Sequence, residues 1–206
     1  MKRLFISFIA MSAIVFASCG NNKTESKDAH ANHNMPEQKE AATEASSDVQ
    51  TVAVTYTSLD PKISSALSSI MNNYFEVKNA LVNDNSKGAS EAAAKLSASI
   101  KSLDKSYFAA DQKASFDKVE ASLKSSADAI AGESDIKAQR EQFITLSDAA
   151  YAIAKDFGAG KAVYREFCPM ARDNNGAYWV SESKEVKNPY FGAEMLECGE
   201  VKEVIQ

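Results

Sequence analysis

The sequence has only 2 histidines among its 206 residues, His30 and His33, and both lie in a polar segment near the N-terminus. The rest of the chain therefore lacks the side chain that most often acts as a general base near neutral pH. It also lacks a phosphate-binding glycine loop, a nucleophile elbow and a His-Glu zinc motif. These absences predict a protein that is not an enzyme.

Clusters of basic residues are absent as well. The chain has 23 Lys and Arg against 28 Asp and Glu, a net charge of −5. Lys2 and Arg3 belong to a segment that we expect to be removed, and without them the net charge is −7. Phosphate backbones are bound by clustered Lys and Arg. The sequence therefore predicts no nucleic-acid partner and no polybasic membrane patch.

The first 18 residues have the pattern of a secretory signal peptide. A basic start precedes an apolar run, Leu4 to Phe16, that is shorter than the ~20 residues needed to span a membrane. Cys19 follows two small residues, which resembles the lipobox of bacterial lipoproteins, although Phe16 stands where that pattern usually has leucine. The resemblance implies cleavage before Cys19, acylation of its sulfur, and anchoring in the envelope of a Gram-negative bacterium, facing the periplasm. The alternative is an ordinary signal peptide with a coincidental cysteine.

Residues 19–51 have almost no side chains to bury, and this composition predicts a disordered tether between the lipidated cysteine and a folded domain. The tether contains His30, His33 and Met35, side chains that capture copper weakly in flexible exported segments. These three residues are thus auxiliary metal ligands on one interpretation. On the other interpretation they are ordinary members of a polar tether.

Residues 52–160 show helical periodicity. Apolar residues recur at three- and four-residue steps in four segments, about 61–82, 86–103, 111–130 and 135–157. The segment from Ser58 to Pro61 indicates a helix start, with a capping side chain and a proline in the first turn, and Gly132 and Gly158 are well placed as helix stops. Short connections between four helices predict an up-down antiparallel bundle in a mainly α protein.

The pattern changes over residues 161–206. Residues 162–168 and 177–180 alternate like short strands, and Asn174-Asn175-Gly176 between them is a hairpin turn signal. The sequence therefore predicts a small C-terminal β-hairpin appendage packed on the helical bundle.

Four sulfur-bearing side chains lie in this appendage: Cys168, Met170, Met195 and Cys198. Residues two apart on a strand face the same way, and residues three apart share a face of a helical turn. Thiols and thioethers together form a soft donor set that selects Cu(I) over harder ions. The appendage is therefore predicted to bind Cu(I) or Ag(I).

Several segments of the chain are similar to a known bacterial family, the domain-of-unknown-function 3347 family. Tyr74 to Asp84 resembles its opening motif. Four later segments resemble its closing motif: Phe167 to Ala171, Gly176 to Trp179, Asn188 to Gly192 and Met195 to Gly199. Members are often stand-alone lipoproteins, and others are fused to periplasmic adaptor subunits of copper- and silver-exporting heavy-metal efflux pumps. The resemblance implies soft-metal handling by association, and an efflux pump adaptor as partner.

A Cys168–Cys198 disulfide is the competing interpretation, because paired cysteines in an oxidising compartment are most often bonded. The loop it closes corresponds to about 3.5 kcal/mol in the chain-entropy treatment. Two hypotheses result: an exported lipoprotein that acts as a Cu(I) or Ag(I) chaperone or efflux accessory, and a non-catalytic structural or protein-interaction module of the envelope, stapled by the disulfide.

Overall fold

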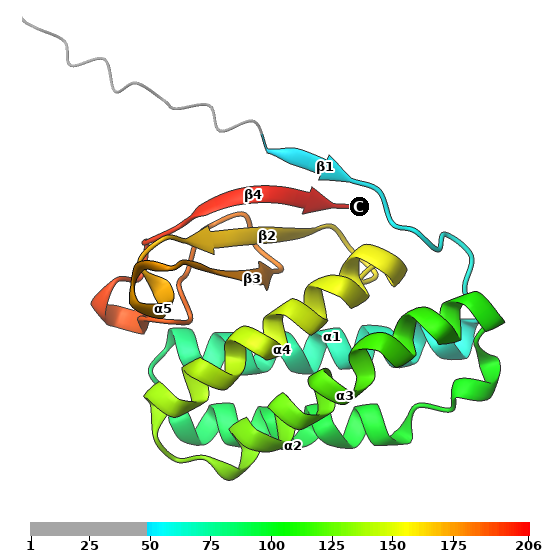
Figure 1. The fold of residues 1–206 in the computed structure, drawn as a ribbon, viewed down its shortest axis with the longest axis horizontal. Helices are drawn as coiled ribbons and strands as arrows, with labels where there is room; N and C mark the ends of the chain where they lie inside the picture. Colours follow the sequence, from blue (N-terminus) through cyan, green and yellow to red (C-terminus); the bar gives the residue numbers. More distant parts are fainter. Residues whose placement is uncertain (1–48) are drawn as a thin grey trace, which may run out of the picture. The chain divides into compact units, whose positions relative to one another are not determined.

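The computed structural model describes residues 49–206 (Figure 1). The predicted signal peptide, the lipidation residue Cys19 and the auxiliary ligands His30, His33 and Met35 lie outside the described residues. The helices are α1 (Pro61–Val82), α2 (Ser86–Ser102), α3 (Ala110–Gly132), α4 (Ile136–Phe157) and the short α5 (Ala171–Asn174). The strands are β1 (Gln50–Val52), β2 (Val163–Cys168), β3 (Ala177–Ser181) and β4 (Glu200–Ile205). Single 3₁₀ turns occur at η1 (Lys105–Tyr107) and η2 (Gly192–Glu194).

Side-chain caps fix where three of the four long helices begin. The carboxylate of Asp60 accepts a hydrogen bond from the backbone N–H of Lys62 at 2.8 Å, at the start of α1. Asn85 caps α2 and Asp135 caps α4 in the same way. Each cap satisfies a backbone donor that the helix itself leaves unpaired. The four-helix bundle predicted from the sequence is confirmed, with helix bounds within about two residues of the expected ones.

The bundle core combines large aromatic side chains with small residues. Tyr74 and Phe143 are fully buried, and their rings stack with centroids 5.5 Å apart. Alanines with no exposed surface, such as Ala93, Ala127 and Ala150, lie on the facing helix surfaces and allow the backbones to approach closely. The same core continues into the sheet through Trp179 and Val163, so one hydrophobic core holds the helices and the strands together.

The sheet has four strands in the order β1-β4-β2-β3. The predicted β2–β3 hairpin is present, with Cys168 opposite Ala177. Two further strands extend it beyond a hairpin: β4 pairs antiparallel with β2, and β1 pairs parallel with β4. β1 takes up residues 50 and 51, at the end of the segment predicted as a tether. The connection from β2 to β3 contains α5 rather than a two-residue turn.

Two tyrosine hydroxyls cover the edge of β3 that faces the bundle. The hydroxyl of Tyr74 on α1 accepts a hydrogen bond from the backbone N–H of Val180 at 3.0 Å. The hydroxyl of Tyr190 donates to the backbone carbonyl of Tyr178 at 2.5 Å. Because an unpaired strand edge is a template for association, these contacts seal the sheet against the helices. Burial raises the pKa of both tyrosines, so the hydroxyls stay protonated.

On the other side of the strands, Arg165 ties β2 to β4 and α4. Its guanidinium lies between the rings of Tyr151 and Tyr178, 3.8 and 4.0 Å from their centroids. It also pairs with Glu203 of β4 at 2.9 Å, and Glu203 accepts a hydrogen bond from Tyr151 at 2.7 Å. Burial raises the pKa of Tyr151 to about 12. The sheet is thus held against α4, as Figure 1 shows.

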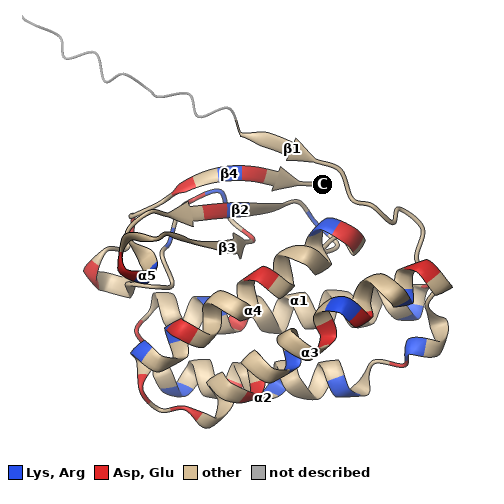
Figure 2. Ribbon diagram, in the orientation of Figure 1, with Lys and Arg blue, Asp and Glu red and all other residues tan. Residues whose placement is uncertain are grey.

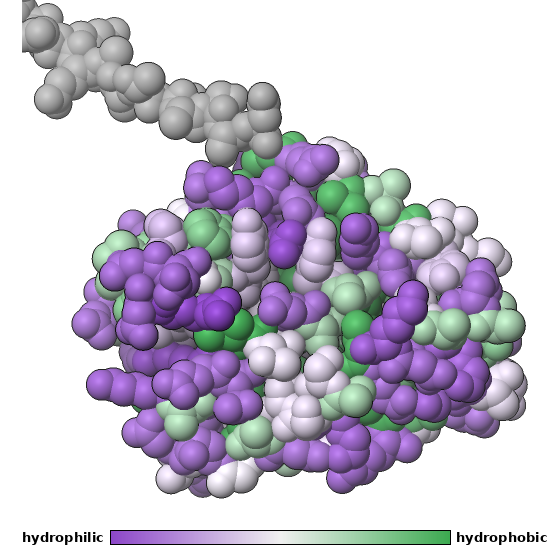
Figure 3. Space-filling view, in the orientation of Figure 1, coloured by the Kyte–Doolittle hydropathy of each residue, from purple (hydrophilic) through white to green (hydrophobic). Residues whose placement is uncertain are grey.

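The surface is mixed in charge. Acidic and basic residues are interspersed along the four long helices (Figure 2). The face in Figure 3 is largely hydrophilic, with scattered apolar side chains. Within residues 49–206, none of the helices has both the length and the apolar character to cross a membrane.

Candidate functional site

The two cysteines predicted as ligands meet in the structure. Cys168 ends β2 and has no exposed surface, whereas Cys198 is half-buried in the β3–β4 loop, residues 182–199. Both are free thiols, and their Sγ atoms lie 2.8 Å apart. The antiparallel pairing of β2 with β4 places Phe167 opposite Glu200, which brings the two cysteines to neighbouring positions at the end of the sheet. The thiol pair is therefore a product of strand register.

The environment of Cys198 favours the protonated thiol. Burial, followed by the hydrogen bond with Cys168, raises the pKa of Cys198 to about 11, and the backbone amide of Met170 opposes that rise. Thiolates rather than thiols bind metal ions. A metal ion bound here therefore has to displace a proton.

The two methionines lie on the wall of a surface hollow of about 810 Å³. Met170 follows β2 and is 45% exposed, and Met195 follows η2 and is half-buried. Side chains of α4, among them Arg140 and Ile144, also line it. Neither Cys168 nor Cys198 lines this hollow. The four predicted ligands thus fall into two groups, a thiol pair in contact and two thioethers that line the hollow.

Across residues 49–206, no group of three or more His, Cys, Asp and Glu side chains is placed to hold a metal ion. Structural zinc sites use four thiolate or imidazole ligands, whereas Cu(I) and Ag(I) accept thiols and thioethers. Two thiols and two thioethers therefore suit a monovalent soft ion better than zinc.

The short element α5 is a left-handed turn, and it forms part of the hollow next to Met170. Arg172, Asp173 and Asn174 have φ values of 53°, 53° and 66°. Each non-glycine residue in this region costs about 1–3 kcal/mol. Backbone hydrogen bonds, such as that from the N–H of Gly176 to the carbonyl of Ala171 at 2.8 Å, hold the turn in place. The sequence signal at residues 174–176 indicated a turn but not its handedness or length.

Arg140 fastens the β3–β4 loop to the end of the bundle. Its guanidinium donates to the backbone carbonyls of Pro189 at 2.8 Å and Leu81 at 2.9 Å, and to the carboxylate of Asp84 at 2.6 Å. Asp84 also accepts a hydrogen bond from the backbone N–H of Ala193 at 2.9 Å. This bond and the Arg140 contact lower the pKa of Asp84. We call Asp84 and Arg140 the loop clamp; it joins the α1–α2 turn to the region around Gly192.

Asn188 fixes the backbone on both sides of Cys198. It is fully buried, and its side-chain amide donates to the carbonyl of Cys198 at 2.7 Å. Its side-chain oxygen accepts from the N–H of Tyr190 at 2.8 Å, and its own N–H donates to the carbonyl of Leu196 at 2.8 Å. The sequence analysis included Asn188 only within a segment that resembles the closing motif of the family. The loop clamp and Asn188 are therefore positioning residues that the sequence analysis missed.

A second group that the sequence analysis missed lies between β2, β3 and α1. Lys78 is 3% exposed and donates to Glu182 at 2.7 Å and to Ser181 at 3.2 Å. Glu166 is fully buried, and neither of its carboxyl oxygens has a hydrogen-bond partner among the described residues. Burial raises the pKa of Glu166 to about 8, against the opposing effects of Lys78 and of the nearby Trp179 indole N–H.

Signals for these buried charges were present in the sequence. Lys78 lies four residues after Tyr74, on the apolar stripe of α1, where a charged residue is unexpected. Glu166 lies two residues before Cys168 and so faces the same way on β2. The indole N–H of Trp179 is near Glu166 but makes no hydrogen bond of normal geometry. At neutral pH this group consists of the protonated carboxyl of Glu166 and of Lys78, which is paired with Glu182.

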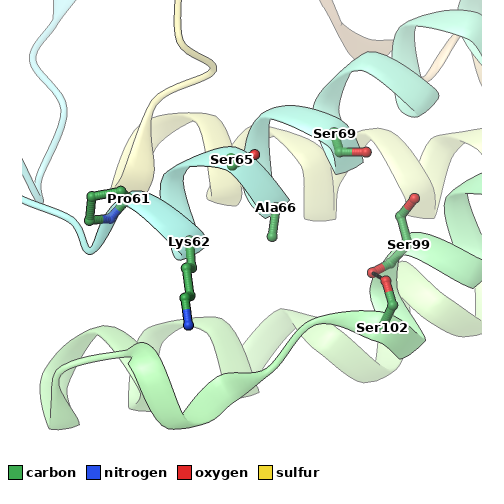
Figure 4. A pocket seen from close by; sticks show the side chains of 7 residues that line it. All are labelled: Pro61, Lys62, Ser65, Ala66, Ser69, Ser99 and Ser102. Atoms are coloured by element: carbon green, nitrogen blue, oxygen red, sulfur yellow. Dashed lines mark hydrogen bonds between the residues drawn. The ribbon is translucent and has the colours of Figure 1, made fainter.

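A separate hollow of about 490 Å³ lies between α1 and α2 (Figure 4). Serine hydroxyls from both helices line it, at Ser65, Ser69, Ser99 and Ser102. The only charged residue in its wall is Lys62, whose ammonium group is already bonded to the Tyr107 hydroxyl at 2.5 Å and lies over that ring. This hollow offers neither a soft ligand nor a pair of titratable groups.

Residues 70–162 match a family model described as "Protein of unknown function (DUF3347)". The match includes the motif from Tyr74 to Asp84 and supports the family assignment drawn from the sequence. It ends before β2 begins, so the thiol pair and both methionines lie beyond it. No curated protein and no solved structure shows significant similarity to the chain.

Proposed function

We propose that this chain is an exported lipoprotein that binds a soft metal ion, Cu(I) or Ag(I), as a chaperone or accessory to metal efflux. The observation that carries the proposal is the contact between two free thiols, Cys168 and Cys198, beside a hollow lined by Met170 and Met195. Thiolates supply the tight binding, and thioethers are the further soft donors at this end of the sheet.

Binding requires a small opening of the thiol pair. Metal–thiolate bonds are about 2.3 Å long in zinc sites, and two sulfurs on one ion at a wide angle then lie farther apart than the observed 2.8 Å. Cys168 is fixed in β2, whereas Cys198 lies in a loop. Because Asn188 holds the backbone at Cys198, the side chain of Cys198 is the part that moves. Both thiols lose their protons as the ion binds.

The proposed location is the envelope of a Gram-negative bacterium, where the protein is held to the membrane through Cys19 and faces the periplasm. The signal-peptide pattern and the lipobox resemblance support this part of the proposal. Several acyl chains anchor a protein firmly, whereas one chain alone is marginal. The family resemblance suggests the adaptor subunit of a heavy-metal efflux pump as the recipient of the ion.

The test is a Cu(I) competition titration of the purified full chain in detergent, under reducing and then oxidising conditions. His30→Ala, His33→Ala and Met35→Leu are introduced together as a background, so that the segment before the folded domain contributes no ligand. One tight equivalent in the reduced protein, lost on oxidation and in Cys168→Ser, supports the proposal. Tight binding that survives in Cys168→Ser contradicts it.

The second candidate is a structural or protein-interaction module stapled by a Cys168–Cys198 disulfide. The 2.8 Å separation of the sulfur atoms favours it, because a disulfide bond needs only a small further approach. The same titration separates the two candidates. Absence of Cu(I) binding in the reduced protein, together with absence of free thiols at residues 168 and 198 in the protein as purified, supports the staple.

A further inference from the structure

The four sulfur side chains differ steeply in exposure. Met170 is 45% exposed, Met195 and Cys198 are half-buried, and Cys168 has no exposed surface. Both methionines line the hollow, which is open to solvent, whereas neither cysteine does. An ion that enters the hollow therefore meets thioethers before it meets thiols.

The hollow carries no dominant charge. Its charged residues are three cations and three anions: Lys137, Arg140, Arg172, Glu141, Asp173 and Glu194. A hollow with balanced charge neither concentrates hard cations nor repels a monovalent ion strongly. Preference for an ion in this hollow must come from the two thioethers, which favour Cu(I) and Ag(I).

We infer that Met170 and Met195 form a capture site that takes up the ion first and then transfers it to Cys198 and Cys168. This inference rests on the proposed function and adds the route by which the ion reaches the thiols. The two groups are adjacent along the chain, because Met170 lies two residues after Cys168 and Met195 lies three residues before Cys198.

The transfer is an exchange of ligands without oxidation or reduction. Bonds from the ion to the thioether sulfurs break, bonds to the two thiolate sulfurs form, and the two thiol protons leave to solvent. Thioethers suit the first step because they are neutral and need lose no proton, so they bind and release the ion readily. Thiolates suit the second step because they bind it more strongly.

The experiment is rapid mixing of Ag(I), a redox-inert probe, with the reduced full chain in the His30→Ala, His33→Ala, Met35→Leu background. Two signals follow the reaction: silver–thiolate absorbance, and fluorescence of Trp179. Trp179 is the only tryptophan, and its ring lies against Gly199, the residue after Cys198. We expect Met170→Leu with Met195→Leu to slow association about tenfold while the equilibrium affinity changes much less, because a capture site speeds arrival and departure alike.

Met71→Leu is the matched control, because Met71 is fully buried in the bundle core and lies outside the hollow. It should leave the association rate unchanged. An association rate in the double variant equal to that of the parent overturns the capture site, as does a loss of affinity that arises only from faster dissociation. Failure of the parent to bind Ag(I) at all overturns the proposed function instead, so the two failures are distinguishable.

Discussion

The helical bundle and the β cap, defined as residues 163–206 together with β1, are built on different principles. The bundle buries mainly apolar side chains at helical spacing, and its helices begin at ordinary caps. The cap buries Glu166 and Asn188, contains three consecutive left-handed residues, and depends on single contacts such as the loop clamp. Bundle stability is therefore spread over many similar positions, whereas cap stability is concentrated in a few unlike ones.

The largest contrast should come from two glycines. Gly192 in the cap has φ of 59°, and an added Cβ would overlap the Asp84 carboxyl and the Arg140 guanidinium. We expect Gly192→Ala to lower the free energy of unfolding by about 3–5 kcal/mol in urea denaturation. Gly132→Ala, at the end of α3 with open space around it, should be neutral or stabilising by up to about 1 kcal/mol. Equal effects at both positions would remove the distinction between the two regions.

The second-largest effect should come from oxidation of the thiol pair, Cys168 and Cys198. Because Cys168 and Cys198 are 30 positions apart, a bond between them should raise the free energy of unfolding by about 3.5 kcal/mol. Hydrogen exchange should show the gain mainly at amides of the cap. The double variant Cys168→Ser with Cys198→Ser supplies the control and should respond to neither oxidant nor reductant. A gain confined to the bundle would contradict the expectation.

The buried carboxyl of Glu166 should make the cap sensitive to pH. Its pKa is raised from 4.5 to about 8, so the unfolded chain loses the proton first as pH rises. Stability should therefore fall between about pH 4.5 and pH 8, by about 2–4 kcal/mol, and level off above that range. Glu166→Gln should flatten this slope in unfolding experiments at a series of pH values. Glu91→Gln, on the exposed face of α2, should leave the slope as it is.

The smallest effect should come from the sealed edge of β3. Tyr190→Phe removes the hydroxyl that bonds to the carbonyl of Tyr178 and should cost about 1 kcal/mol. Tyr107→Phe removes a hydroxyl that bonds to Lys62 at the surface, and this change should cost less than about 0.5 kcal/mol. Thermal unfolding of both variants measures the difference, and a larger loss in Tyr107→Phe would reverse the expected order.

The contrast between the bundle and the cap also explains which elements could be predicted from the sequence. Helix periodicity, the helix start at Pro61 and the helix stop at Gly158 predicted the bundle, because each signal acts within a few neighbouring residues. The β2–β3 hairpin was predicted for the same reason. The pairing of β4 with β2 was not, nor was the pairing of β1 with β4, because these pairs join segments about 40 and about 150 positions apart and leave no local pattern.

For the candidate site, sequence reasoning selected both thiols, and the structure places them in contact. It treated the methionines as members of the same ligand set, whereas they line a hollow that the thiols do not. Arg140 and Asn188 were missed because their roles depend on carbonyl groups that only the folded chain brings close. Residue type and spacing indicated the chemistry of the donors. The geometry between them depends on tertiary contacts.

β1 also has a consequence for the order of assembly. β1 pairs with β4, and the N–H of Gln206 donates to the carbonyl of Val52. β1 can therefore pair only after β4 has been synthesised. Translation delivers the N-terminal side first, which means that the bundle forms while β1 still has no neighbour. Pairing between two such distant strands is slow compared with helix formation. The newly made chain would thus pass through a stage in which the sheet is not yet complete, and in which Cys198 is not yet beside Cys168 and remains open to other thiols.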